Sequence, residues 1–266
     1  MDMIEKMTLI IPNGNKELYG LLTLPDSEEG SGKTGKSGDA VQRALPLVIG
    51  CHGFDGSYTS KLDYAEFLAE HGIAFYGFDF YGGSRASMSG GTMEEMSVLT
   101  EAEDLLAVIR CFRKDPRFDP ERIVLWGHSQ GGYVASYVAG IHPEWIKAMI
   151  LLYPAYVIQD HVRDIQREYG GIPDHYSQWD CDLGRIYGED ALSHDIYRIL
   201  ETYPGQVLIV HGDQDEMVPL HYSERALKHF PDASLYVMKG AGHGFEGEDR
   251  ETMKELALAF LQKVLL

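Results

Sequence analysis

The stretch 122-RIVLWGHSQGGYVASYVAG-140 decides the fold, because it passes from an apolar run into a helical pattern through a glycine-rich turn. Ser129 lies at this turn, in the pattern G-x-S-x-G formed with Gly127 and Gly131. A serine between a strand end and a helix start adopts a strained backbone conformation, and the flanking glycines let both elements approach it closely. The stretch therefore predicts a strand, a sharp turn and a helix, with Ser129 between them.

Alternating strands and helices extend from this stretch in both directions. Apolar runs predict strands at 46–53, 73–80, 122–127, 147–155, 206–212 and 234–240, and amphipathic patterns predict helices at 60–72, 100–114, 131–140, 221–230 and 249–266. Continuous apolar strands separated by such helices indicate a mostly parallel, doubly wound α/β sheet covered on both faces. For the second helix, Thr100 and Glu103 have the spacing of a capping box and predict its start.

Three segments depart from this alternation. The runs 7–12 and 17–24 flank 13-NGNK-16 and predict an antiparallel N-terminal hairpin, because Asn-Gly is a strong turn signal. Residues 25–44 are rich in Gly, Ser and charge and predict a solvated, mobile loop. Residues 156–202 show no legible strand and helix unit, but their aromatic residues favour a lid subdomain with its own small core over a disordered excursion. The lid would be inserted into a single domain of residues 1–266.

The composition excludes several classes of function. The chain has 23 Lys and Arg against 41 Asp and Glu, a formal charge of −18 that repels nucleic-acid backbones and anionic membrane surfaces. No apolar run approaches the roughly 20 residues of a membrane span, and the first residues lack the pattern of a signal peptide. We therefore expect a cytoplasmic protein with no nucleic-acid or membrane partner. The three cysteines form no C-x-x-C pair, so neither a disulfide framework nor a zinc site is expected.

Two later strands end in side chains that could activate Ser129. The strand that runs into HGDQDEMVP delivers Asp213 and Asp215, and the strand that runs into GAGHGF delivers His243. The carboxyl ends of strands are the ligand-binding edge of open α/β sheets. A serine hydroxyl needs an adjacent base, and the base needs a carboxylate that fixes its tautomer. These residues predict a Ser-His-Asp triad in which either aspartate could be the acid.

A tetrahedral intermediate also needs two N–H donors that meet its negative charge. Gln130 follows the candidate nucleophile and can supply one of them. The loop 50-GCHGFDGSY-58 follows the first parallel strand, and its His52-Gly53 turn can point the N–H of Phe54 toward the same place. Phe54 and Gln130 are therefore the predicted oxyanion hole. This chemistry requires no metal and no organic cofactor.

Together, HGF at 52, GHSQGG at 127, HGDQDEMVP at 211 and GAGHGF at 240 resemble the α/β-hydrolase superfamily over nearly the whole chain. Within it the chain most resembles the bacterial cinnamoyl (feruloyl) esterases. That resemblance implies that Asp215 is the triad acid and that a compact lid follows the sixth strand. It also implies that Asp160, which follows a Pro-Ala pair, and Tyr187 contact the phenolic hydroxyl of the substrate. The implied activity is hydrolysis of hydroxycinnamate esters through an acyl-enzyme.

Other functions share these features and stay open. Short-chain carboxylesterases, lipases, thioesterases, acyltransferases and peptidases of the prolyl-oligopeptidase type use the same core and triad. Outside the enzymes, a noncatalytic hydrolase-fold binding protein is the alternative, which an intact set of Ser, Asp and His disfavours. The expected partner is a small-molecule ester, and a homodimer stays open because the sequence does not fix the oligomeric state.

Overall fold

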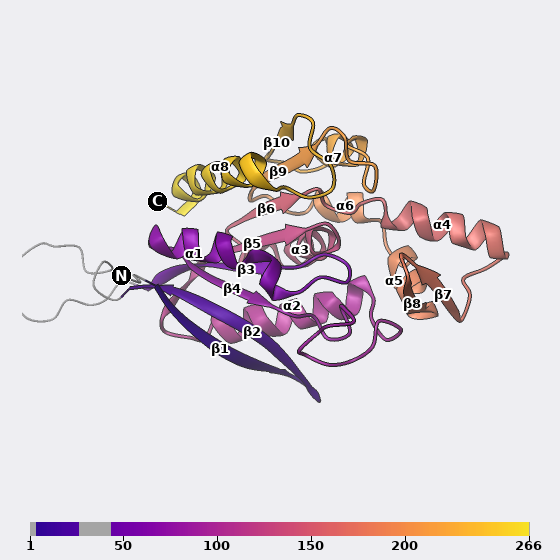
Figure 1. Cartoon of the computed structure of the whole chain (residues 1–266), viewed down its shortest axis with the longest axis horizontal. Coiled ribbons are helices and arrows are strands. Elements are labelled where there is room, and N and C mark those ends of the chain that lie inside the picture. Colours follow the sequence, from indigo (N-terminus) through magenta and orange to yellow (C-terminus); the bar gives the residue numbers. More distant parts are fainter. Residues whose placement is uncertain (1–3, 27–43, 266) are drawn as a thin grey trace, which may run out of the picture.

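One eight-stranded sheet forms the centre of the protein (Figure 1). The computed structural model describes residues 4–26 and 44–265; most of the predicted loop at 25–44 lies outside these ranges. The strand order is β1-β2-β4-β3-β5-β6-β9-β10, and every pair from β4 to β10 is parallel. The strands are β1 (Ile4–Asn13), β2 (Lys16–Pro25), β3 (Leu45–Cys51), β4 (Ala74–Phe78), β5 (Phe118–His128), β6 (Ala148–Leu152), β9 (Gln206–Gly212) and β10 (Ala233–Met238).

The predicted N-terminal hairpin is confirmed. β1 and β2 pair antiparallel, with Asn13 opposite Lys16 at the turn, and β2 continues antiparallel onto β4. Gly14 in this turn has a φ of 63°, the left-handed conformation that glycine adopts without steric cost. The Asn-Gly signal therefore set the register of the first two strands.

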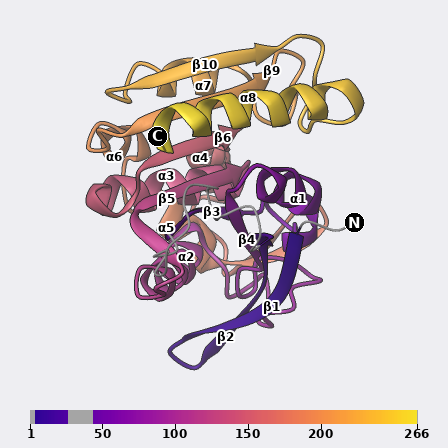
Figure 2. The ribbon, with the colours of Figure 1, turned by 90° about the vertical axis from the view of Figure 1, so that its left-hand side faces the viewer.

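Helices cover both faces of the sheet, as predicted. In Figure 2, α1 and α8 lie on one side, and α2 and α3 lie on the other. Two separate groups of buried apolar side chains correspond to these faces: Leu68 and Leu261 belong to the first group, and Leu105 and Val134 to the second. Burial of each such side chain contributes roughly 1.5–3 kcal/mol. The helices are α1 (Leu62–Glu70), α2 (Val98–Phe112), α3 (Gln130–Ile141), α7 (His221–Ala226) and α8 (Gly247–Leu265), with 3-10 turns at Tyr58–Lys61 and Pro143–Trp145.

The start of α2 differs from the prediction. Ser97 is the N-cap: its Oγ accepts the N–H of Thr100 at 3.1 Å, and Thr100 Oγ1 accepts the N–H of Ser97 at 2.8 Å. The predicted capping box of Thr100 and Glu103 is therefore wrong by one turn. Two overlapping pairs have the same spacing, and the earlier one is favoured by a tertiary contact, because the Ser97 hydroxyl also donates to Asp190 at 2.5 Å.

Between β6 and β9 the chain forms an inserted segment, residues 156–202. It contains α4 (Ile158–Tyr169), β7 (His175–Gln178), β8 (Cys181–Gly184), α5 (Arg185–Leu192) and α6 (Ile196–Leu200), and β7 and β8 form a separate antiparallel pair. Figure 1 shows α4, α5, β7 and β8 at the right-hand end of the sheet. The buried side chains of the segment, among them Leu183, Tyr187 and Tyr197, join the group that packs against α2 and α3. The predicted separate core is therefore wrong, because the aromatic residues complete the main core.

Within the two described ranges, no helix combines the length and the apolar character needed to cross a bilayer.

Candidate active site

Ser129 occupies a strained turn between β5 and α3. Its φ is 49° and its ψ is −118°, a combination that costs a non-glycine residue about 1–3 kcal/mol. The surrounding backbone holds this conformation. The Ser129 N–H donates to Leu152 O at 2.9 Å, and the Ser129 carbonyl accepts the N–H groups of Gly132 and Ala155, both at 2.9 Å. The serine therefore stands at the carboxyl end of the sheet with its side chain free to react.

The glycines beside Ser129 allow β3, β5 and α3 to meet without side chains between them. A Cβ atom built on Gly131 would lie 2.3 Å from His52 O and 2.4 Å from Cys51 O, and one on Gly127 would lie 2.5 Å from Gly131 O. Such contacts involve backbone atoms that cannot move independently of the sheet. The G-x-S-x-G pattern is thus a packing requirement of this turn.

We expect Gly131→Ala to lower stability and activity together, because the methyl group displaces α3 from the end of β3. Overpacking of this kind costs about 1–3 kcal/mol or more, which thermal denaturation would detect as a lower Tm. Gly171→Ala is the matched control, because a Cβ there meets no atom within 4 Å. Equal melting temperatures for the two variants would contradict this account of the elbow.

His243 connects Ser129 to Asp215. Its Nε2 lies 3.0 Å from Ser129 Oγ, and its Nδ1 lies 2.8 Å from Asp215 Oδ2. The other oxygen, Asp215 Oδ1, accepts the N–H groups of Met217 at 3.0 Å and Val218 at 2.8 Å. The carboxylate is thereby fixed in one orientation. A hydroxyl, an imidazole and a carboxylate are thus connected by hydrogen bonds in the order that nucleophilic catalysis by a serine requires.

The charge of Asp215 is strongly stabilised. Burial alone raises the pKa of this carboxyl, but hydrogen bonds from His211, His243 and the Val218 N–H outweigh burial and hold its pKa far below the usual value. His211 is fully buried, and its Nε2 lies 2.7 Å from Val218 O and 3.3 Å from Asp215 Oδ2. Since both neighbours are acceptors, Nε2 carries a proton. Sequence reasoning missed His211, although a histidine inside the otherwise apolar run of β9 was a usable signal.

Asp213, the other acid that the sequence left open, does not reach His243. It is exposed, and its Oδ1 accepts the Gly240 N–H at 2.7 Å. This bond ties the loop after β9 to the end of β10. The geometry therefore pairs His243 with Asp215.

Of the two predicted oxyanion donors, Gln130 follows Ser129 in the chain, and Phe54 lines the same cavity as Ser129. Among the described residues, neither the Phe54 N–H nor the Gln130 N–H donates a hydrogen bond, so both are available to a ligand. The loop that carries Phe54 reaches the serine because Gly53 has no side chain: a Cβ there would lie 3.2 Å from Ser129 Cβ.

His52 positions this loop. Its Nε2 accepts the Phe80 N–H at 3.1 Å, so its proton lies on Nδ1, which donates to Gly53 O at 2.8 Å. Burial lowers the pKa of His52 to about 4, which keeps the ring neutral and in this tautomer at neutral pH.

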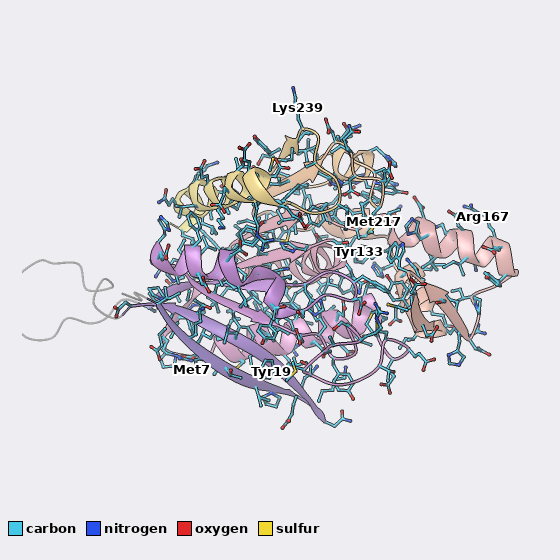
Figure 3. All side chains as sticks on the ribbon, viewed as in Figure 1. Met7, Tyr19, Tyr133, Arg167, Met217 and Lys239 are labelled. Atoms are coloured by element: carbon cyan, nitrogen blue, oxygen red, sulfur yellow. The ribbon has the colours of Figure 1, made fainter. Side chains whose placement is uncertain are left out.

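A cavity of 360 Å³ opens over Ser129 and His243. The side chains of Phe54, Tyr153, Trp179 and Met217 give it apolar walls, while Asp55, Ser60 and His128 give it a polar edge. Trp179 comes from the turn between β7 and β8, so the inserted segment contributes to the cavity. Figure 3 shows Met217 on the side of the core that faces α4. Nowhere in residues 4–26 or 44–265 do three or more His, Cys, Asp or Glu side chains gather as a metal site would require.

The two residues predicted to contact a phenolic hydroxyl lie outside the lining of this cavity. Asp160 Oδ2 accepts the hydroxyl of Tyr222 at 2.9 Å, and Asp160 Oδ1 pairs with Arg163 at 2.7 Å. Tyr187 is buried, and its hydroxyl donates to Gln130 Oε1 at 2.8 Å. In this arrangement Tyr187 holds the side chain of Gln130, a predicted oxyanion donor, and Asp160 connects α4 to α7. Their contact with substrate stays a prediction.

A profile of the prolyl oligopeptidase family matches residues 63–266. The chain is 24% identical over 157 residues to the inactive dipeptidyl peptidase 10 of Rattus norvegicus, and the match covers 54% of this chain and 18% of that protein. It is 24% identical over 256 residues to the dihydrolipoyllysine-residue acetyltransferase component of the acetoin cleaving system of Pseudomonas putida, covering 82% of this chain and 64% of that protein. The chain thus spans less than two thirds of either relative.

Among solved structures, Est1E from Butyrivibrio proteoclasticus with bound ferulic acid is similar over nearly its whole length. The TM-score is 0.84 at 27% identity, with 97% of this chain and 99% of that chain covered. This likeness and the family match confirm the α/β-hydrolase fold predicted from the sequence.

Proposed function

The chain belongs to the prolyl oligopeptidase family, and we propose that it is a serine carboxylesterase that hydrolyses esters of hydroxycinnamic acids. The observation that supports a hydrolase most directly is the connected geometry of Ser129, His243 and Asp215 beneath an open cavity. Two unpaired N–H groups beside Ser129 support the same chemistry, because they can receive the oxyanion of a tetrahedral intermediate.

In the proposed reaction, Ser129 Oγ attacks the ester carbonyl carbon while His243 Nε2 takes its proton. The N–H groups of Phe54 and Gln130 bind the carbonyl oxygen as it becomes negative. The intermediate collapses when the C–O bond to the alcohol breaks and His243 returns the proton to the departing oxygen. Water then attacks the acyl-enzyme with the same base, which releases the acid and restores Ser129.

An aromatic acyl group is favoured by the composition of the cavity walls. Trp179 is 45% exposed and lies edge-on to Phe54, with ring centroids 5.3 Å apart. Trp179 and Asp180 have φ values of 49° and 60°, so they form the two-residue turn of the β7 and β8 hairpin and point an indole at the cavity. The similar protein Est1E binds ferulic acid, a hydroxycinnamate, and this supports the same acyl class here.

We expect Trp179→Ala to raise the KM for methyl ferulate about tenfold, because an aromatic contact contributes up to about 1.5 kcal/mol, and to leave kcat/KM for p-nitrophenyl acetate within about twofold. Tyr169→Ala is the control, because this aromatic residue at the end of α4 is 63% exposed and lies outside the cavity lining. An equal loss of kcat/KM for methyl ferulate and p-nitrophenyl acetate would show that Trp179 does not recognise the aromatic acyl group.

A substrate panel tests the proposal as a whole. Methyl ferulate, methyl p-coumarate and methyl caffeate should be hydrolysed with higher kcat/KM than acetate and butyrate esters, and an aminoacyl anilide should be cleaved slowest. The opposite order, with the anilide as the preferred substrate, would make the chain a peptidase. The family match and the similarity to a dipeptidyl peptidase favour peptidase activity as the second candidate function.

That relative is described as inactive, so a noncatalytic role needs its own test. A fluorophosphonate probe should label Ser129 within minutes, because the probe requires an activated serine. A protein that remained unlabelled and hydrolysed none of the panel would be a binding protein.

A further inference from the structure

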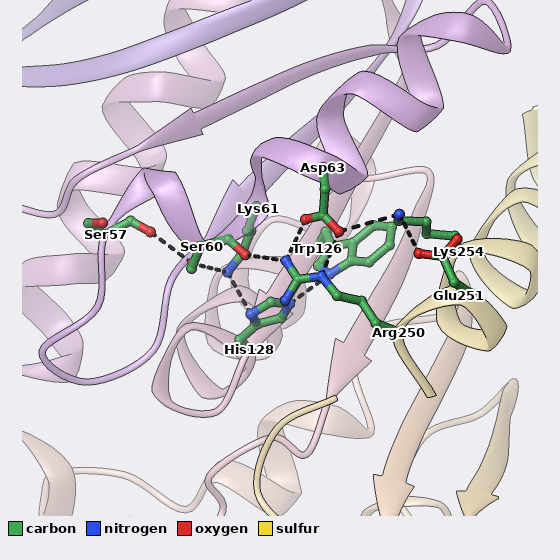
Figure 4. A network of polar contacts seen from close by, with 9 residues as sticks. All are labelled: Ser57, Ser60, Lys61, Asp63, Trp126, His128, Arg250, Glu251 and Lys254. Carbon is green, nitrogen blue, oxygen red and sulfur yellow. Dashed lines mark hydrogen bonds and ion pairs between the residues drawn. The ribbon is translucent and has the colours of Figure 1, made fainter. Parts of the chain in front are cut away.

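A buried lysine lies behind the nucleophilic turn. Lys61 ends the 3-10 turn before α1, and only 1% of it is exposed. Its Nζ lies 2.7 Å from Nδ1 of His128, the residue that precedes Ser129 (Figure 4). No carboxylate of the described ranges forms an ion pair with Lys61, since nearby Asp63 is engaged by Arg250 and Lys254. A buried ammonium without a counter-ion is strongly disfavoured.

The neighbours of His128 determine which protons this pair carries. The indole N–H of Trp126 can only donate, and it points at His128 Nε2 at 3.1 Å. Nε2 is therefore the acceptor, and the single proton of the neutral ring lies on Nδ1. That N–H must donate to Lys61 Nζ. An ammonium has no lone pair to accept it, so the contact requires a neutral amine.

The groups that face Lys61 are consistent with this assignment. Burial is the largest effect and lowers the pKa of Lys61 to about 7; Asp63 on α1 raises it, and Arg250 on α8 lowers it further. The Cys51 thiol on β3 also faces Lys61, but burial raises the pKa of that thiol and keeps it uncharged. Burial and the neighbouring Lys61 also lower the pKa of His128 well below its usual value. Both members of the pair are thus held uncharged at mildly alkaline pH.

A chain of ring contacts connects this pair to the reacting groups. The His128 ring lines the cavity over Ser129 and lies 5.8 Å from the ring of Tyr153, between centroids. The Tyr153 ring in turn lies 4.5 Å from the ring of His243. A change in the orientation of His128 therefore alters the cavity wall and the packing of the base at once.

We propose that Lys61 is a positioning residue that works as a neutral amine: its Nζ accepts a hydrogen bond from the Nδ1–H of His128 and so holds that ring in the cavity wall, and protonation of Lys61 lowers turnover. Its effect on turnover rests on the esterase function proposed above. Protonation turns Nζ into a donor that faces the Nδ1–H donor of His128. The ring can accept from the ammonium only by moving its proton to Nε2, where it faces the Trp126 N–H. One of the two hydrogen bonds is lost either way.

The sign of the pH dependence follows from these bonds. Lys61 is neutral above about pH 7 and protonated below it. Both hydrogen bonds of the His128 ring, to Lys61 and from Trp126, are therefore present above this pH, and one of them is lost as the pH falls. At pH 6 about a tenth of the molecules retain the neutral amine. Turnover of the wild-type enzyme should therefore fall as Lys61 becomes protonated.

Long-range ¹H–¹⁵N correlation spectra of the histidine rings test the assignment in the wild-type protein. We expect His128 as the Nδ1–H tautomer at pH 8.5, with a change in its ring ¹⁵N shifts centred near pH 7. Lys61→Met should abolish this transition, and Lys254→Met should leave it in place, because Lys254 belongs to the same network but does not contact His128. An Nε2–H tautomer at pH 8.5, or shifts that do not change down to pH 5.5, would overturn the proposal.

Kinetic measurements test whether protonation of Lys61 lowers turnover. Between pH 8.5 and pH 6, kcat/KM for p-nitrophenyl acetate should fall about tenfold more in the wild type and in Lys254→Met than in Lys61→Met. Parallel acid limbs in all three proteins would overturn the effect on turnover. Should Lys61→Met not fold, Lys61→Gln replaces it, because the glutamine side chain offers His128 an uncharged acceptor. The wild-type spectra test the tautomer of His128 without any variant. Because the spectra require no substrate, a protein without ester activity would refute the esterase proposal and leave the neutral lysine to be judged by the spectra.

Discussion

Replacing Ser129 with alanine is expected to lower kcat for methyl ferulate by about 10⁴- to 10⁶-fold and to leave the fold intact. The Ser129 hydroxyl makes the hydrogen bond to His243, so its removal deletes the proposed nucleophile and leaves the base and acid in place. The backbone hydrogen bonds that hold the turn use the Ser129 N–H and carbonyl, which alanine retains. Stopped assays on purified protein, with Tm as the folding control, give the measurement.

The backbone of Ser129 offers a second, independent readout. Glycine adopts a φ of 49° and a ψ of −118° without the steric cost that alanine and serine incur. Ser129→Gly should therefore be as inactive as Ser129→Ala but more stable, by about 1 kcal/mol. A Ser129→Ala variant that kept most of the activity would refute the mechanism. A Ser129→Gly variant less stable than Ser129→Ala would refute the strain at the turn.

The parts of the fold that the sequence predicted are those in which local chemistry and tertiary structure demand the same residues. The Asn-Gly turn before β2 requires a left-handed residue at Gly14, and the elbow requires glycine at Gly127 and Gly131. The candidate triad could be predicted because each of its members follows a strand, and the carboxyl ends of parallel strands meet at one edge of the sheet. The choice of Asp215 over Asp213 came from family resemblance and not from the residues alone.

The parts that the sequence did not predict depend on packing across the molecule. Ser97 caps α2 in place of Thr100, with a contact to Asp190 that lies far along the chain. The inserted segment forms no core of its own, because its buried aromatic residues fill a core shared with α2 and α3. Lys61 resembles any lysine at the start of an amphipathic helix, and only the fold shows that it is buried against His128.

Asp215→Asn is expected to lower kcat about 10⁴-fold, because the amide reverses the hydrogen-bond polarity that His243 needs. The N–H groups of Met217 and Val218 would retain the amide oxygen at the Oδ1 position, which places the NH₂ group against His243 Nδ1 and His211 Nε2. Facing a donor, His243 Nδ1 must accept, so its proton moves to Nε2. That nitrogen can then no longer take the proton of the serine hydroxyl.

Asp213→Asn is the matched control for this change. Its amide oxygen can still accept the Gly240 N–H, and its exposed position carries no contact with His243, so kcat should stay within about twofold of the wild type. The comparison separates two carboxylates that stand two residues apart in one loop. A larger loss in Asp213→Asn than in Asp215→Asn would show that the loop rearranges in solution and that the acid of the triad is Asp213. Equal, small losses would mean that His243 is oriented without a carboxylate, in conflict with the strongly lowered pKa of Asp215.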